Sequence, residues 1–229
     1  MIAPKTEGKT KELVPAGNHV ARLYEIIYLG TLNTGYKDQN GDDKYQYKVR
    51  LTWELPNELR KFGKEGEEKE LPVVISKEVT FSLYKSEKQT ATLRTIANAL
   101  VGVSLTDAEA DSFDIKKLLG FACMLEISHE TFKDNGNVYA KAVGFGSIPK
   151  GLTVPPQVNE SKEKSVANLS REEIEELPEF IQVKMKSSNE YKERFDPETI
   201  ARREEIQEKV DSLKTQAKEE EITPEDIPF

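Results

Sequence analysis

The stretch KYQYKVRLTWEL, residues 44–55, alternates strictly between two kinds of side chain. Every second position is apolar or aromatic, and the positions between them are polar or charged. A period of two places the two sets on opposite faces of a β-strand. The alternation therefore predicts a strand with one face turned towards a core, and that face consists of Tyr45, Tyr47, Val49, Leu51 and Trp53.

In the rest of the first 150 residues, the spacing of the apolar residues is typical first of strands, then of a helix and then of strands again. β-forming residues predict strands on either side of the alternating stretch, and apolar residues at helical spacing then lead up to Gly102, a typical helix stop. Two further strand patterns surround the turn KDNG. The predicted elements are strands at 19–31, 44–55 and 73–85, a helix at 86–102, a short capped helix followed by a turn within 106–120, and strands at 121–132 and 137–148.

Five short strands with a helix between the third and the fourth are the plan of the five-stranded Greek-key barrel called the OB fold. The position of the helix is the specific part of this pattern. We therefore predict a mainly β protein with an OB-fold barrel over residues 12–150, preceded by a flexible N-terminus at 1–11. Another small α+β barrel or a sandwich is the alternative.

The character of the chain changes after residue 148. Residues 151–169 contain prolines, serines and charges without any period, which predicts a linker. A capping box, Ser170 with Glu173, opens a predicted helical region at 170–218. Its last helix carries a narrow apolar stripe, which requires either the barrel or another copy of the helix as a partner. The stripe consists of Ile206, Val210, Leu213 and Ala217.

The composition bears on the class of function. The net charge of −8 arises entirely after residue 150, so any basic surface on the predicted barrel must be local. One cysteine, Cys123, and two distant histidines match no zinc spacing, and the sequence has neither a phosphate-binding loop nor a nucleophile elbow. We expect a protein that is not an enzyme and uses no metal or cofactor. No apolar run approaches a membrane span and no secretory signal is present, so we expect a cytoplasmic protein without membrane partners.

Binding of single-stranded nucleic acid needs aromatic platforms for the bases and cations along the backbone. The predicted barrel interleaves both kinds of residue. In an OB fold the face of strands 2 and 3 and the loops 1–2 and 4–5 hold an oligonucleotide. The candidate DNA-binding residues are Tyr36, Lys37, Lys44, Tyr47, Lys48, Arg50, Lys61, Phe62, Lys64, Tyr84, Lys85, Phe132, Lys133, Tyr139 and Lys141.

Some of these aromatic residues have a second interpretation. Tyr45 and Tyr47 share the face of Trp53, so they could belong to the core instead of contacting a ligand. Tyr36 and Phe62 stand in polar loops, where a core role is harder to explain.

The chain ends with an acidic run followed by Asp226-Ile227-Pro228-Phe229, and Glu225 directly precedes these four residues. This end resembles the C-terminal tip of bacterial single-stranded-DNA-binding proteins, a family that joins an OB fold through a linker to such a tip. The body does not follow that family closely, and the whole is more similar to a phage-encoded protein of this kind. The resemblance implies that residues 219–229 form a disordered acidic tip that recruits replication, recombination or repair enzymes.

The chemistry of the tip supports the same expectation. Pro228 favours an extended Ile227, and Phe229 offers a ring and a terminal carboxylate to an apolar pocket with a basic rim. We therefore expect a protein that binds and protects single-stranded DNA, in the host cytoplasm if it is phage-encoded. The alternative is an adaptor that imitates the host tip and sequesters host enzymes without binding DNA. A strand-annealing accessory is a third possibility, and self-association through the last helix stays open.

Overall fold

The structure is a computed structural model, which describes residues 12–63, 66–134 and 136–219, the last five by their backbone alone. The chain divides into two compact units. The first comprises Met1–Leu29 and Gln46–Ser165, and the second comprises Gly30–Tyr45 and Val166–Phe229. The expected flexible N-terminus, Lys64 and residues 220–229 of the expected acidic tip lie outside the described residues, whereas Glu219 is the last residue of α6.

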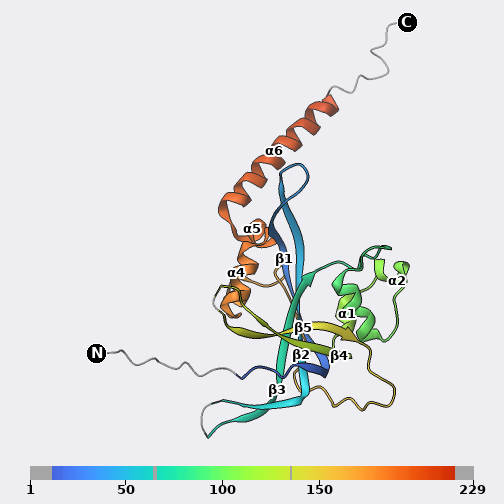
Figure 1. Cartoon of the computed structure of the whole chain (residues 1–229). Coiled ribbons are helices and arrows are strands. Elements are labelled where there is room, and N and C mark those ends of the chain that lie inside the picture. The colour runs from blue at the N-terminus through green and yellow to red at the C-terminus, as the bar shows by residue number, and fades with distance from the viewer. Residues whose placement is uncertain (1–11, 64–65, 135, 220–229) are drawn as a thin grey trace. The chain divides into compact units, whose positions relative to one another are not determined.

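The order of elements agrees with the sequence analysis up to residue 146: three strands, helices, and two strands. Figure 1 shows these elements along the chain. The strands are β1 (Gly17–Lys37), β2 (Asp43–Phe62), β3 (Lys69–Thr80), β4 (Ala122–Thr131), β5 (Val138–Gly146) and β6 (Lys162–Ser165). The helices are α1 (Thr92–Val101), α2 (Asp107–Asp111), the 3₁₀ turn η1 (Ile115–Leu118), α3 (Arg171–Glu175), α4 (Glu179–Ser187), α5 (Asn189–Phe195) and α6 (Pro197–Glu219).

The first five strands form one curled antiparallel sheet in the order β3-β2-β1-β4-β5. In Figure 1, β4 and β5 run across the direction of β2 and β3, and this turn of the sheet makes a half-barrel. The two edge strands of the sheet, β3 and β5, approach each other. Lys77 Nζ on β3 donates a hydrogen bond to the carbonyl oxygen of Ala142 on β5 at 2.6 Å. The sheet is thus an open barrel, with the core on its concave side.

The alternation that predicted β2 is confirmed by burial. Val49, Leu51 and Trp53 are all fully buried in the core. The helix α1 closes this core by packing against β3, β4 and β5. Its buried face includes Leu93 and Ile96, and Gly102 ends it in the left-handed conformation, as the sequence predicts.

The strands extend further than the sequence patterns predict. β1 and β2 continue almost to the turn at Asn40-Gly41. β2 also passes beyond residue 55, where the predicted strand ends, as far as Phe62, with an irregularity between Leu55 and Leu59. Charged side chains in these extensions hide the strand signal. Pairing depends on backbone hydrogen bonds, which a charged residue makes as well as an apolar one.

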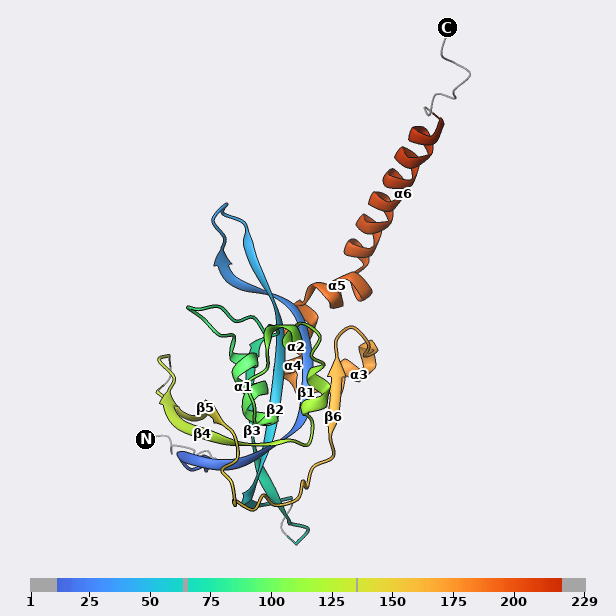
Figure 2. The ribbon, with the colours of Figure 1, turned by 90° about the vertical axis from the view of Figure 1, so that its right-hand side faces the viewer.

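The expected linker at 151–169 contains β6, which pairs in parallel with residues 25–28 of β1 (Figure 2). The β1–β4 ladder covers only residues 17–22 of β1, so β6 occupies backbone positions that lie beyond it. The fully buried carboxylate of Glu54 fixes the preceding segment, because it accepts hydrogen bonds from the backbone N–H groups of Val158 and Asn159 at 2.8 and 2.7 Å. This part of the chain is therefore bound to the first unit, and it contains a short strand that the sequence patterns did not predict.

The second unit contains the tip of the β1–β2 hairpin and the helices α3 to α6. The predicted capping box of Ser170 and Glu173 begins α3, and Asp196 accepts a hydrogen bond from Thr199 N–H at the start of α6. The carboxylate of Glu190 accepts hydrogen bonds from the backbone N–H and the hydroxyl of Thr31, both at 2.7 Å. Along α6 the stripe residues Ile206, Val210 and Leu213 are exposed.

Candidate functional site

The face of β2 and β3 opposite the core carries a row of paired polar side chains. Lys48 lies opposite Thr80, and Arg50 lies opposite Glu78. Lys48 Nζ donates hydrogen bonds to Gln46 Oε1 at 2.7 Å and to Thr80 Oγ1 at 3.0 Å, and burial lowers the pKa of this lysine. Arg50 Nη1 lies 3.2 Å from Glu78 Oε1. The row thus holds one cation bonded to neutral groups and one cation paired with a carboxylate.

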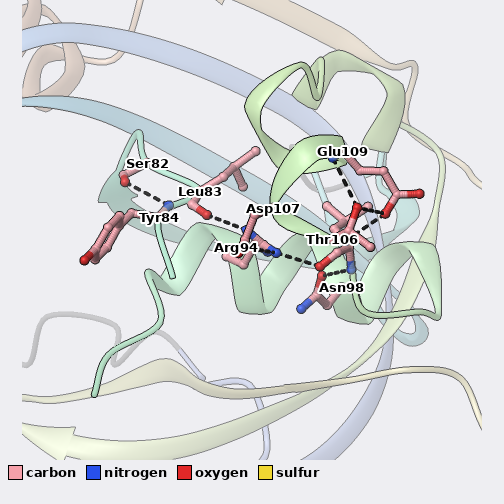
Figure 3. Close-up of polar contacts among 9 residues, drawn as sticks. Ser82, Leu83, Tyr84, Arg94, Asn98, Thr106, Asp107 and Glu109 are labelled. Atoms are coloured by element: carbon pink, nitrogen blue, oxygen red, sulfur yellow. Dashed lines mark hydrogen bonds and ion pairs between the residues drawn. The ribbon is translucent and has the colours of Figure 1, made fainter. Parts of the chain in front are cut away.

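The loop between β3 and α1 is held in place by a buried arginine. Arg94 of α1 is only 2% exposed. One of its nitrogens donates to the carbonyl oxygen of Leu83 at 2.9 Å, and the other donates to that of Leu105 at 2.6 Å and contacts Asp107 at 3.0 Å. Figure 3 shows these bonds, with the Tyr84 ring pointing away from the guanidinium. Arg94 therefore fixes the residue next to Tyr84.

Tyr84 lines a surface hollow of about 240 Å³, which we call the Tyr84 hollow. Its described lining consists of Gln46, Thr80, Ser82, Tyr84, Gln89, Thr90, Ala91 and Thr92, all uncharged. The tyrosine is 64% exposed. Lys48 bonds two of the lining residues, so its ammonium lies at the edge of the hollow. Lys85 is the next residue in the loop and forms no ion pair with the residues that the structure describes.

A ring with an exposed face, neutral hydrogen-bonding groups and nearby ammonium groups suits one class of ligand. The ring can stack on a nucleobase, the amides and hydroxyls can bond to base edges or sugars, and the ammonium groups can contact phosphates. The Tyr84 hollow brings two of the predicted residues together, namely Tyr84 in its lining and Lys48 at its edge. Lys85 follows Tyr84 in the loop, and Arg50 lies two residues further along β2, paired with Glu78.

The ring of Tyr47 contacts another aromatic ring of the first unit. Its ring packs against Phe81 with centroids 5.4 Å apart, and Phe81 in turn meets Tyr28 edge-on at 5.5 Å. Burial raises the pKa of Tyr28 to about 12. Tyr47 is half-buried and Phe81 is 41% exposed, so these rings lie at the margin of the core beyond Val49, and both roles of Tyr47 stay predictions.

A second group of predicted residues lies on the β4–β5 hairpin. Phe132 and Tyr139 stack on each other with centroids 4.1 Å apart. Tyr139 and Lys141 both donate hydrogen bonds to Glu130, and these bonds lower the pKa of that carboxyl. Lys133 forms no ion pair with the described residues. The hairpin thus pairs most of its own groups internally.

Lys61 and Phe62 stand at the far end of β2, where they pair with Glu70 and Lys69 of β3. A strand rises about 3.3 Å per residue, so Phe62 lies roughly 45 Å along the strand from Lys48. Lys61 forms an ion pair with Glu68 at 3.7 Å. The structure therefore does not bring these residues to the Tyr84 hollow.

Three predicted residues belong to the second unit. Tyr36 is 74% exposed near the tip of the β1–β2 hairpin. Lys37 pairs with Asp43 at 2.8 Å, which lowers the pKa of that carboxyl. Lys44 accepts a hydrogen bond from Thr34 through its carbonyl oxygen. The hairpin tip thus carries an exposed ring and one neutralised lysine.

The five expected partner-binding residues, Glu225 to Phe229, lie outside the described part of the chain. Cys123 is buried as expected, and burial raises its pKa to about 12. Within residues 12–63, 66–134 and 136–219, no group of three or more His, Cys, Asp or Glu side chains could hold a metal ion. Over the same ranges, no helix has both the length and the apolar character needed to cross a membrane.

The sequence analysis did not identify Gln46, Thr80 or Arg94 as parts of a site. Arg94 left no signal, because it stands between Leu93 and the exposed Thr95, an ordinary place for a cation in an amphipathic helix. Thr80 and Gln46 gave none either, since only the register of β2 and β3 places them beside Lys48 and Tyr84.

No model of a known protein family matches this sequence, and no curated protein matches it either. The arrangement of residues around the Tyr84 hollow is therefore the basis on which a function is proposed.

Proposed function

We propose that the protein binds single-stranded DNA without sequence preference, through an OB-fold barrel formed by the first unit. The observation that carries the proposal is the exposed Tyr84 ring in the lining of a neutral hollow, with the ammonium group of Lys48 at its edge. Stacking on one aromatic side chain contributes about 1–3 kcal/mol per base and tolerates every base. This chemistry holds a strand without reading its sequence.

The sheet supports the OB-fold part of the proposal. Five strands with α1 between β3 and β4, and a sheet that curls until β3 approaches β5, match the plan of that barrel. The Tyr84 hollow lies at the end of the β2–β3 face, which is where OB folds bind oligonucleotides.

The second part of the proposed function is the recruitment of partner proteins through the acidic tip. A chain that ends in Asp226-Ile227-Pro228-Phe229 offers a ring and a carboxylate to a partner protein. In this proposal the first unit protects single strands during phage DNA replication or recombination, and the tip recruits the enzymes that act on them.

An adaptor that recruits enzymes without holding DNA is the second candidate, and specific contacts favour it. Several of the cations expected to meet phosphates are already paired with carboxylates, among them Lys37, Arg50 and Lys141. A surface with neutralised cations gains less from counterion release on binding DNA.

Fluorescence anisotropy with labelled oligo-dT and with a duplex of equal length separates the two candidates. We expect binding of oligo-dT that weakens with salt and exceeds binding of the duplex. Tyr84→Ala should reduce the affinity by roughly 5- to 100-fold, while Tyr84→Phe, which keeps the stacking face, should retain it.

The matched control is Phe121→Ala, because Phe121 is also an exposed ring of the first unit but does not line the Tyr84 hollow. A preference for duplex, or no binding of oligo-dT at low salt, would contradict the proposed function. Equal losses in Tyr84→Ala and Phe121→Ala would remove the Tyr84 hollow from it.

A further inference from the structure

A second hollow lies on the other side of the loop that carries Tyr84. It measures about 420 Å³ and lies between α1 and the end of β5, so we call it the α1 hollow. Lys85 and Thr90 pair across the neck of the loop as a short antiparallel bridge, and Ser86 N–H donates to the carbonyl oxygen of Gln89 at 2.7 Å. Thr90 lines both hollows. The two hollows are therefore separated only by the neck of this loop.

The α1 hollow is rich in hydrogen-bond donors. Among the described residues that line it there is no acidic side chain, and Lys85 contributes its ammonium group. Hydroxyls come from α1, from the segment after it and from Ser147 at the end of β5. The side-chain oxygen of Asn98 already accepts a hydrogen bond from Leu105 N–H, so Asn98 has N–H donors left to offer. Such a lining suits a ligand that carries phosphate oxygens.

An isolated anion is nevertheless a poor match, because the C-terminal end of α1, at Gly102, faces this hollow with the negative end of the helix dipole. The hollow also has an apolar wall, the half-buried ring of Phe145. A nucleotide within a chain fits both the negative end of the α1 dipole and the Phe145 wall better than an isolated anion does. Its base or sugar can lie against the ring while its phosphate contacts Lys85. The volume falls within the range of about 300–1,000 Å³ that is usual for small-molecule sites.

We infer that the α1 hollow is a second nucleotide subsite and that a single strand crosses the neck of the loop at Thr90, with one nucleotide at Tyr84 and a following one in the α1 hollow. This inference rests on the proposed function. It assigns a path to the strand, which leaves the β2–β3 face and continues over α1 towards Ser147.

Length dependence of binding tests this path. OB folds occupy about 4–16 nucleotides, so a series of oligo-dT over that range should gain affinity when it becomes long enough to reach the α1 hollow. The variant Ser147→Glu places a carboxylate in the exposed rim of that hollow alone. We expect it to reduce the affinity of the longer oligonucleotides about tenfold by charge repulsion and to leave the shortest ones unchanged.

The matched control is Ser112→Glu, which adds the same charge at an exposed serine of the first unit that lines neither hollow. A second measurement uses the unaltered protein, so that it does not depend on the folding of a variant. Oligo-dT with 5-iodouracil at successive positions is cross-linked by light, and the attached peptide is identified. We expect one position to label the segment containing Phe145 and another to label Tyr84.

The outcomes separate this inference from the proposed function. If the unaltered protein binds no oligo-dT, both are overturned. If it binds, but Ser147→Glu equals Ser112→Glu at every length and no cross-link reaches the Phe145 segment, only the second subsite is overturned.

Discussion

Arg94 Nη1 donates a hydrogen bond to the carbonyl oxygen of Leu83 at 2.9 Å. This contact joins a buried helix residue to the backbone directly before Tyr84. An arginine is suited to the position because its planar fork serves several acceptors at once, here Leu83, Leu105 and Asp107. The position of the exposed Tyr84 ring therefore depends on the buried side chain of Arg94.

Replacing Arg94 by Met should destabilise the protein by roughly 2–4 kcal/mol, because the carbonyl groups of Leu83 and Leu105 lose their donor. Arg94→Lys should recover part of this loss, since an ammonium group cannot reach all three acceptors in the same geometry. Denaturant unfolding measures the change. Thr95→Ala, at an exposed position of the same helix, is the control and should stay within about 0.5 kcal/mol.

A double-mutant cycle tests whether Arg94 acts on DNA through Tyr84. Arg94→Lys should lower the affinity for oligo-dT in the presence of Tyr84 and have little further effect in Tyr84→Ala, because the group it positions is then absent. Losses that simply add would show that Arg94 affects binding by another route.

Lys48 predicts a pH dependence of DNA binding. Burial lowers its pKa below the usual 10.5, so the ammonium group loses its proton at a lower pH than an exposed lysine does. The proposed contact of Lys48 with phosphate should therefore form at neutral pH and be lost as the pH rises through the lowered pKa. Lys48→Arg keeps its charge throughout this range.

Anisotropy titrations from neutral pH upwards into the alkaline range below the usual lysine pKa check this expectation, with unfolding monitored over the same range. The affinity of the unaltered protein should fall more steeply with pH than that of Lys48→Arg. Parallel pH profiles for the two proteins would exclude Lys48 as a phosphate contact.

Replacing Gly30 by any residue with a side chain should destabilise the second unit. Its φ of +94° is disfavoured for other residues, and an added Cβ would lie 2.5 Å from Glu190 Oε2 and 2.7 Å from Ser188 Cβ. Gly30→Ala should therefore destabilise this unit by about 2–4 kcal/mol. Gly35→Ala is the matched control, because Gly35 also has a positive φ, +75°, but no atom lies within 4 Å of the added carbon.

Hydrogen exchange of the Thr31 amide is a local measure of the effect, since this amide donates to Glu190 at 2.7 Å. Exchange should accelerate strongly in Gly30→Ala and little in Gly35→Ala. Equal acceleration in both variants would mean that backbone strain alone, without the crowding at Glu190, decides the outcome.

Removal of residues 219–229 should leave the affinity for oligo-dT unchanged or raise it. The tip is acidic, so it competes with DNA for any basic surface instead of contributing to it. Titrations of the full chain and of the truncated chain at low salt measure the difference. A large loss of affinity on truncation would place the tip in the DNA-binding site itself.

The strand pattern of the first unit could be predicted from the sequence because burial on one face imposes a period of two. Val49, Leu51 and Trp53 show this directly, and Gly102 ended the predicted helix because a positive φ favours glycine there. β6 escaped prediction because four residues, KEKS, are too few to show a period, and their pairing with β1 depends on backbone groups that carry no sequence signal.

The residues of the candidate site, too, could be predicted only in part from the sequence. The sequence by itself determined that rings and cations alternate along the strands and that Tyr84 stands beside Lys85 after β3. Only the tertiary structure decided which of them meet. The register of β2 and β3 places Lys48 beside Thr80. Arg94 holds the loop in which Tyr84 lines its hollow. Tyr47, on β2, contacts Phe81 instead. The physical reason is that local periodicity sets the face on which a side chain lies, whereas its neighbours come from contacts between residues far apart in the chain.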